Sequence, residues 1–246
     1  MFLELITLKT KDKEESSSLK FFFKKNDNLA FSLYEWVLGE TEGASGAIAA
    51  LSIRGDGATD PSSENGSVSR TYEISQEGSM ARFIIFEELR GEPVDVVGAT
   101  DQVAGQLALD LNDLGAARMG PIQVNARTFA TDEERRDCAT RNRILHTDDH
   151  EYITFTPEEI IGLEGSARVG DTLTFQIRGN LAIRNIVNPA VFEATMRIVS
   201  PDLISGEATS LVSRRAYNLS VSDLPFLANV ADEVRLTFSG EFHTPK

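Results

Sequence analysis

The sequence predicts an all-β fold, an antiparallel sandwich or barrel, that begins near residue 71. Three observations predict it. Apolar and polar residues alternate over several long stretches, Gly, Pro and Asp residues separate these stretches, and only one segment has a clear helical pattern. An alternation with a period of two gives each strand one apolar and one polar face, so the apolar faces together would enclose a common interior.

The expected strands share this alternation. They cover residues 103–111, 122–126 after the Gly120-Pro121 turn, 173–183, 192–198 and 234–238. Strands of nine to eleven residues span about 30 Å at ~3.3 Å per residue, which is long for a globular domain. Long strands with one apolar face suit a barrel that encloses something elongated.

One helix is expected between the strands, over residues 132–145. Thr131 and Glu134 have the spacing of a capping box, in which Thr131 caps the helix and Glu134 reaches back to it. Residues 156–159 repeat this spacing after the alternating Ile153 and Phe155. A strand that bends at Pro157 is therefore expected there in place of a second helix.

The first 70 residues differ in composition from the rest. Six of the seven lysines lie within the first 25 residues, and residues 39–70 are rich in Gly, Ala and Ser. Such a segment buries too little apolar surface to offset its ordering entropy. We expect residues 1–70 to form an N-terminal extension with a flexible linker, and residues 71–246 to form one domain. No signal peptide is visible at the N-terminus.

The composition also limits the classes of function. The 246-residue chain has a formal net charge of −14, which repels a phosphate backbone, so no nucleic-acid partner is expected. Cys138 is the only cysteine, which excludes an intramolecular disulfide and a multi-cysteine metal site. No apolar stretch approaches the length of about 18 residues that a membrane-spanning helix needs.

Four stretches of the expected domain match one known family in order and spacing. They are TYEISQEGSMARFII (71–85), which matches an opening strand pair; residues 131–155; RGNLAIRNIVNPAVF (178–192), a strand-turn-strand; and SRRAYNL (213–219), near the last hairpin. The second stretch matches through Thr131, Asp132, Arg136, Asp137, Leu145, Asp149, Ile153, Thr154 and Phe155. From about Tyr72 to Phe242 the chain resembles the YceI-like family, small lipocalin-like barrels that bind polyisoprenoid lipids.

The chain departs from the family pattern at five positions. His150 and Glu151 stand where the family usually has an aromatic residue and Pro. Asn185 and Asn218 replace Gly, and Asn tolerates a positive φ better than most residues. Ala216 replaces an Asp, so any role of that carboxylate is absent or moved in this chain.

The resemblance implies a lipocalin-like antiparallel β-barrel with one or two short helices. It further implies that the domain carries a polyisoprenoid or quinone-type lipid without catalysis and without a cofactor or metal. The lipid would contact the inward-facing side chains, namely Phe83, Ile85, Val103, Leu107, Leu109, Ile122, Val124, Ile153, Phe155, Leu173, Phe175, Ile177, Leu181, Phe192, Met196, Arg214, Leu236 and Phe238. The expected partner is an isoprenoid or another long-chain lipid; transient membrane contact and a homodimer are compatible with it. The family also implies a periplasmic or extracellular location.

Two other functions stay open. The apolar faces could fill the interior themselves, which would make the domain a structural or interaction module without a ligand. The domain could also be an enzyme that acts on a lipid in its cavity. The sequence favours the enzyme least, because it has no recognisable nucleophile–base pair.

Several polar residues have alternative roles. Arg214 is in phase with Ser210 and Val212 on a strand, so it would point inward and either pair with Asp137 or contact a lipid head group. The densest basic cluster would form a solvated helix face or meet a head group at the barrel mouth; it comprises Arg135, Arg136, Arg141 and Arg143. His146 and His150 would share a face of a helix and could bind zinc, but a position at a helix end disfavours this.

Overall fold

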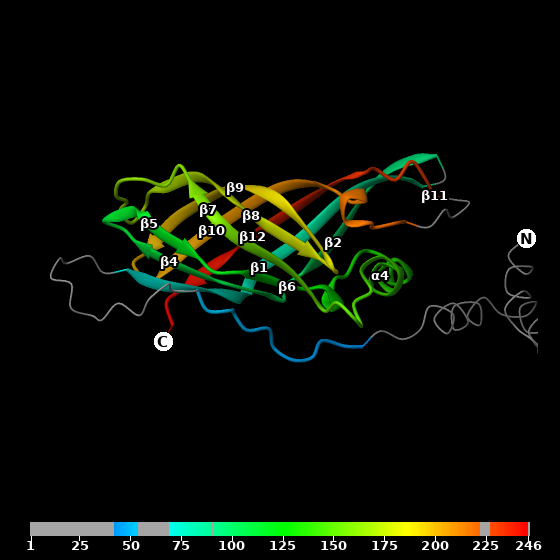
Figure 1. The fold of residues 1–246 in the computed structure, drawn as a ribbon, viewed down its shortest axis with the longest axis horizontal. Helices are drawn as coiled ribbons and strands as arrows, with labels where there is room; N and C mark the ends of the chain where they lie inside the picture. Colours follow the sequence, from blue (N-terminus) through cyan, green and yellow to red (C-terminus); the bar gives the residue numbers. More distant parts are fainter. Residues whose placement is uncertain (1–41, 54–68, 90, 222–226, 246) are drawn as a thin grey trace, which may run out of the picture. The chain divides into compact units, whose positions relative to one another are not determined.

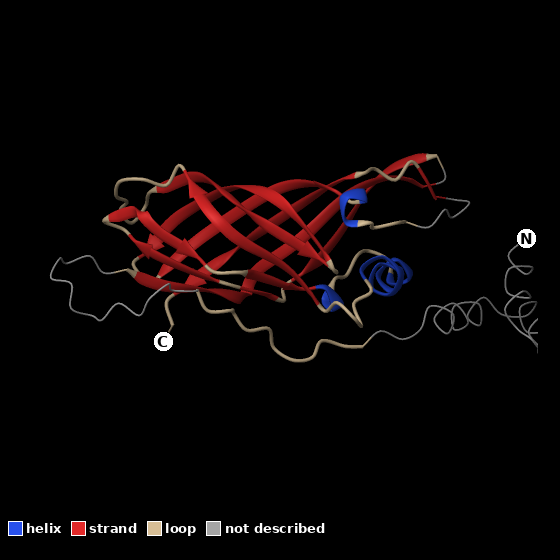
Figure 2. Cartoon of the chain, viewed as in Figure 1, coloured by secondary structure: helices blue, strands red, loops and turns tan. Residues whose placement is uncertain are grey.

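The computed structural model describes residues 42–53, 69–89, 91–221 and 227–245. These residues form a strongly curled antiparallel sheet, with short helical segments gathered at one end of its strands (Figures 1 and 2). The expected all-β antiparallel fold is confirmed. Residues 1–41 and 54–68 of the expected N-terminal extension lie outside the described residues.

The elements follow one another along the chain with short connections. The strands are β1 (Arg70–Leu89), β2 (Glu92–Thr100), β3 (Val103–Ala104), β4 (Gln106–Asp110), β5 (Asp113–Met119), β6 (Ile122–Asn125), β7 (Tyr152–Ile161), β8 (Thr172–Ile183), β9 (Ile186–Ser200), β10 (Leu203–Ser213), β11 (Leu227–Ala228) and β12 (Glu233–His243). The helical segments are η1 (Ala126–Thr128), α4 (Glu134–Ala139), η2 (Thr140–Leu145) and η3 (Arg215–Tyr217).

The two ends of the sheet meet at Gly105. The strand order is β3-β6-β7-β8-β9-β10-β12-β1-β4-β5, and β3 and β4 are consecutive pieces of one stretch of chain. The expected single strand over 103–111 is therefore divided: β3 pairs with β6, whereas β4 pairs with β1 and β5. The amide of Ile74 donates to the carbonyl of Gly105 over 3.0 Å. This junction joins β1 to the β3–β6 pair, so the sheet curls back on itself at this level.

The opening strand pair that the resemblance implies over residues 71–85 is a single strand. β1 runs for 20 residues, with a register shift between Ser75 and Met80 in its pairing with β12. Gly78 has a φ of 85° at this irregularity, a conformation that Gly adopts without steric cost. The Gly therefore makes a bulge in one strand where a turn between two strands was expected.

The helix starts later than its predicted capping box. Glu133 is the N-cap of α4 and makes no side-chain cap, so the expected pairing of Thr131 with Glu134 is wrong. Asp137 takes that role from inside the helix, because its Oδ1 accepts from the Thr131 hydroxyl at 2.6 Å and from the Thr131 amide at 2.7 Å. The second half of the expected helix is π-helical, and it ends at His146 with a φ of 51°.

The segment around Pro157 is a strand, as expected. β7 is continuous from Tyr152 to Ile161, and its pairing with β8 shifts register between Pro157 and Glu159. Opposite the shift lies Gly179, where a Cβ atom would stand 2.3 Å from the carbonyl oxygen of Thr156 and 2.9 Å from the Cα of Pro157. A Gly is therefore required for the two backbones to approach this closely.

We predict that Gly179→Ala destabilises the domain, because the methyl group would collide with backbone that cannot move aside. The expected loss is about 2 kcal/mol or more in the free energy of unfolding, measured by urea denaturation. Gly115→Ala on β5 is the control, since its Cβ would meet only the Asp113 carboxylate, at 3.5 Å. Equal stability of the two variants would contradict the close approach at Gly179.

Candidate functional site

The strands place most of the predicted apolar residues on the inner face of the curled sheet. Seven of the seventeen are buried in one apolar cluster, and eight more pack against it. The remaining two are Val103, which is fully buried beside Val124 on β6, and Ile85, which is half-buried beside Val234 on β12. The structure thus brings the predicted apolar set together, although it gives no direct test of which members would touch a ligand.

One end of the interior is tightly packed. Tyr72, Ile198 and Ile204 have an exposed fraction of 0%. The hydroxyl of Tyr72 donates to the carbonyl of Pro201 over 2.8 Å, and burial raises the pKa of this phenol, which keeps it a donor. This end of the sheet is closed by its own side chains.

Farther along the strands, inward side chains are only half-buried. Examples are Phe192 on β9 and the neighbours Leu236 and Phe238 on β12. Phe192 packs edge-to-face on Phe155, and Phe238 on Phe242, with ring centroids 4.7 and 5.9 Å apart. Leu236 and Phe238 are paired with strands on both sides, whereas Phe192 is paired with β8 alone, because the β9–β10 pairing ends at Glu193. These inward side chains thus keep part of their surface accessible, in contrast to those at the packed end.

A slot separates β5 from the second half of β7. Among the described strands, β5 pairs only with β4, and residues 156–161 of β7 pair only with β8. At one end the slot is bounded by the β6–β7 pairing. At the other end, the Leu114 amide donates to Gly165 and the Ala167 amide donates to Leu111, at 2.9 and 2.8 Å. The two facing strand edges are thus held together only at the two ends of the slot.

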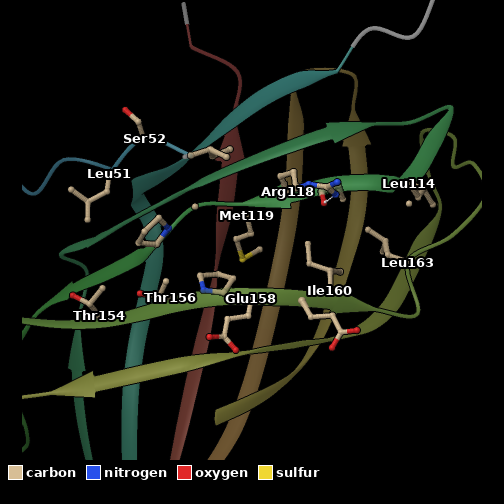
Figure 3. A pocket seen from close by; sticks show the side chains of 17 residues that line it. Leu51, Ser52, Leu114, Arg118, Met119, Thr154, Thr156, Glu158, Ile160 and Leu163 are labelled. Carbon is tan, nitrogen blue, oxygen red and sulfur yellow. Dashed lines mark hydrogen bonds between the residues drawn. The ribbon is translucent and has the colours of Figure 1, made fainter. Parts of the chain in front are cut away.

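The slot contains a cavity of about 900 Å³, whose lining includes both buried and exposed residues. Its inner part is apolar and belongs to the interior cluster: Leu114, Ala117, Met119, Ile160 and Leu163. Met119 and Ile160 extend from the two facing strands toward each other (Figure 3). Its outer part is mostly polar and is lined by Arg118, Thr154, Thr156 and Glu158, with Leu51, Ser52 and Ile53 along the rim.

None of the slot residues is among the predicted site residues. β5 has the sequence DLGAARM, whose small residues hide its alternation, so no strand was expected there. One feature of the sequence indicated that strand pairing is interrupted here. Pro121 lacks the amide hydrogen that a continuous strand ladder requires. Pairing between distant strands decides where an edge is left open, and a sequence pattern does not contain that information.

Residues 42–53, where a flexible linker is expected, lie against the sheet. The side chain of Arg127, 6% exposed, donates to the carbonyls of Gly43, Thr147 and Asp148 at 2.9 to 3.1 Å. Its guanidinium also lies 3.3 Å from the carboxylate of Glu151. The hydroxyl and amide of Ser45 donate to the same carboxylate at 2.5 and 2.8 Å. These contacts anchor the segment to the start of β7.

Glu151 is the central acceptor of this anchor. Burial alone would raise the pKa of its carboxyl, but hydrogen bonds from Ser45 and Asn125 and the charge of Arg127 hold it below the usual value. Glu151 therefore stays ionised although it is enclosed. This position is one of the departures from the family pattern, and the structure gives it a role that a Pro could not have, because Pro has no acceptor side chain.

Arg214 lies just beyond β10, and the expected ion pair with Asp137 is wrong. Its Nε and Nη1 donate to the carbonyls of Ala231 and Leu219 at 2.8 and 3.0 Å, and its Nη2 donates to Val230 at 3.3 Å. Asp137 is instead bound by Thr131. The guanidinium thus links the end of β10 to the segment before β12, and its hydrogen bonds are largely used within the protein.

The other departures near Arg214 also have structural explanations. Asn218 has a φ of 52°, which is the positive φ that Asn was expected to tolerate at this position. In the β8–β9 turn the residue with positive φ is Arg184, at 56°, and not Asn185. Ala216 has no carboxylate, and near it Asp232 accepts from the Ser213 hydroxyl at 2.7 Å and from the Arg215 amide at 3.0 Å.

The arginines of the helical segment do not act as one cluster. Arg136 forms ion pairs with Asp132 and with Glu87 of β1, the second at 3.3 Å, whereas Arg143 is exposed. Arg141 donates to the carbonyl of Phe129 over 3.2 Å. His146 ends the helix, so the two histidines do not share a helical face. Within the described ranges, no group of three His, Cys, Asp or Glu side chains could hold a metal ion.

Comparison with known proteins identifies a family over most of the described sheet. The model of the YceI-like domain matches residues 72–242. No curated protein matches the sequence. In the part of the chain that is described, no helix has the length and apolar character needed to cross a membrane.

Solved structures share the fold at low sequence identity. A polyisoprenoid-binding domain from Saccharophagus degradans, implicated in plant cell wall breakdown, is 13% identical, with a TM-score of 0.56 over 72% of this chain and 100% of that domain. BcnA from Burkholderia cenocepacia is 14% identical, with a TM-score of 0.53 over 68% of this chain and 98% of that protein. The YceI protein of Campylobacter jejuni is 13% identical, with a TM-score of 0.50 over 61% of this chain and 85% of that one.

We predict that Arg214→Met destabilises the protein, because it removes the donors of three carbonyl groups. The expected loss is about 2–4 kcal/mol in the free energy of unfolding, measured by chemical denaturation. Arg215→Met is the control. The Arg215 side chain is 72% exposed and its ion pair with Asp232 is long, at 3.8 Å, so the loss of stability should stay below about 1 kcal/mol. An Arg214→Met variant with normal stability that had lost a bound lipid would instead assign Arg214 to a head group.

We predict that acid releases residues 42–53 from the sheet. The folded-state pKa of Glu151 is lowered, so its contribution is present above the unfolded pKa of about 4.3 and is lost as the pH falls through the lower folded value. Hydrogen exchange at the Ser45 amide, which donates to Glu151, measures this as the pH is lowered stepwise from about 6 through the folded-state pKa of Glu151. Glu151→Gln should lose protection already at the higher pH, while Glu164→Gln, at an exposed position, should not. Protection of the Ser45 amide that does not change with pH would contradict the proposed role of Glu151 in holding residues 42–53.

Proposed function

Because the chain belongs to the YceI-like domain family, we propose that it binds a long apolar lipid, of the polyisoprenoid or quinone type, inside the curled sheet. The observation that carries the proposal is the set of inward side chains that are only half-buried, such as Phe192, Leu236 and Phe238. A sheet that served only as a filled core would bury these side chains fully. An apolar chain would cover them and remove their remaining surface from water.

The relation to a solved polyisoprenoid-binding domain supports the class of ligand. That domain matches this chain over its whole length, at 13% identity. A sequence identity this low supports only a shared fold. Which class of lipid binds is our inference from the apolar interior. The proposed activity is binding and carriage, which needs no catalytic group.

The energetics suit a carrier that exchanges its cargo with a membrane. Burying a methylene group is worth ~0.8 kcal/mol relative to water. Summed over a long tail that leaves water, this free energy would exceed the limit of known non-covalent binding affinities. Relative to a bilayer the transfer of the tail is nearly neutral, because both environments are apolar. Small differences in polar contacts would then decide whether the lipid is loaded or released.

We predict that the protein purified under mild conditions carries a lipid. Native mass spectrometry should show an added mass of several hundred daltons, and mass spectrometry of an organic extract should identify the molecule. Detergent-free purification is essential, since detergents compete for the same apolar space. An apo mass together with a lipid-free extract would instead support a structural or interaction module.

A matched pair of variants locates the lipid. Leu236→Trp adds bulk to a half-buried inward position and should reduce the lipid-bound fraction. Leu211→Trp adds the same bulk on β10, where Leu211 is 55% exposed, and should leave binding unchanged. Equal lipid content in both variants would place the lipid outside the curled sheet.

A further inference from the structure

The slot between β5 and β7 suggests a route into the interior. Resting on the proposed lipid-binding function, we propose that the lipid tail enters and leaves sideways through this slot, and not through either end of the curled sheet. The tail is the flexible, chain-like part of the ligand, and the head group would stay at the outer rim during passage.

Both ends of the interior are covered by buried side chains. At the packed end lie Tyr72, Ile198 and Ile204, with 0% exposure. At the other end Phe129, Leu145 and Tyr217 of the helical segments are 6%, 7% and 2% exposed, and they belong to the same cluster as the strands. Entry at an end would require these packed residues to separate, which breaks apolar contacts that the resting protein maintains.

Entry through the slot breaks no strand pairing, although Leu114 and Leu163 of its inner lining, 1% and 6% exposed, must move aside. The facing edges of β5 and β7 share no strand pairing between the slot's two ends, so they can separate without loss of a hydrogen-bonded ladder. The loop at one end contains Gly162, Gly165 and Gly170, all with positive φ. Within the described ranges, two backbone hydrogen bonds connect this loop to the β4–β5 hairpin. Glycines at these positions give the loop backbone conformations that other residues resist.

The lining of the slot matches an amphipathic molecule in transit. The inner residues Met119, Ile160 and Leu163 continue directly into the apolar cluster. Met is flexible and adapts to irregular apolar shapes. The outer residues Arg118, Thr156 and Glu158 are exposed and would keep contact with water or a polar head group. The polarity of the lining therefore changes from the outer to the inner face, as a lipid entering tail first requires.

The test is to tie the two edges together. In a Cys138→Ala background, Arg118→Cys and Glu158→Cys place thiols on β5 and β7 at the outer rim, and a short bifunctional maleimide links them. The control links Gln176→Cys to Glu193→Cys, which face each other on the paired strands β8 and β9. The probe is a long-chain polyprenyl lipid with a nitrobenzoxadiazole head group, presented in phosphatidylcholine vesicles, and its transfer is followed by fluorescence.

Linking the slot should slow probe uptake by about tenfold or more, while the control link leaves the rate unchanged. Probe loaded before linking should remain bound and should leave the protein equally slowly, which shows that the linked protein still folds and binds. Uptake at the unlinked rate through a linked slot would overturn the lateral route and leave the proposed function intact. A failure of every variant, including the unlinked protein, to take up the probe would remove the proposed function and the route with it.

Discussion

The architecture depends on two stretches of chain that each pair with different strands along their length. Residues 103–110 pair with β6 before Gly105 and with β1 and β5 after it. Residues 113–125 pair with β4 before the Gly120-Pro121 break, and with β3 and β7 after it. Because a strand edge can bond to only one neighbour at a time, these exchanges of partner close the sheet at one level and leave it open at another. The slot is thus a consequence of how the sheet closes.

Much of the fold was predictable because a strand's alternation reports its two faces directly. The long strands β8, β9 and β12 each contain a predicted stretch, and Pro157 bends a strand as expected. The prediction failed in β5, where small residues remove the contrast between the two faces. It also failed at Gly105, where the strand changes its pairing partner although the chain continues in the same direction. Local capping was also misjudged, because Thr131 bonds to Asp137 and not to Glu134. The apolar set of the candidate site followed from alternation alone, whereas the slot depends on contacts between distant strands.

The departures from the family pattern show how a fold keeps its geometry when individual residues change. Asn218 retains the left-handed turn that a Gly would otherwise make. Asp232, just before β12, orders the turn that contains Ala216 by accepting hydrogen bonds from the Ser213 hydroxyl and the Arg215 amide. Hydrogen bonds to the Ser213 hydroxyl and this amide hold the pKa of the Asp232 carboxyl below its usual value. Arg214 completes the turn by bonding to carbonyls on both of its sides.

The surroundings of Arg127 bear on where the folded unit begins. The family match starts at residue 72, yet part of the solvation of this guanidinium comes from Gly43 and Ser45, almost thirty residues earlier. A cation that has left water needs polar groups of the protein in its place, and here a segment outside the matched residues 72–242 supplies some of them. A domain boundary placed at the start of the family match would therefore separate Arg127 from two of its hydrogen-bond acceptors, Gly43 and Ser45. The folded unit therefore includes residues 42–53 together with the matched residues.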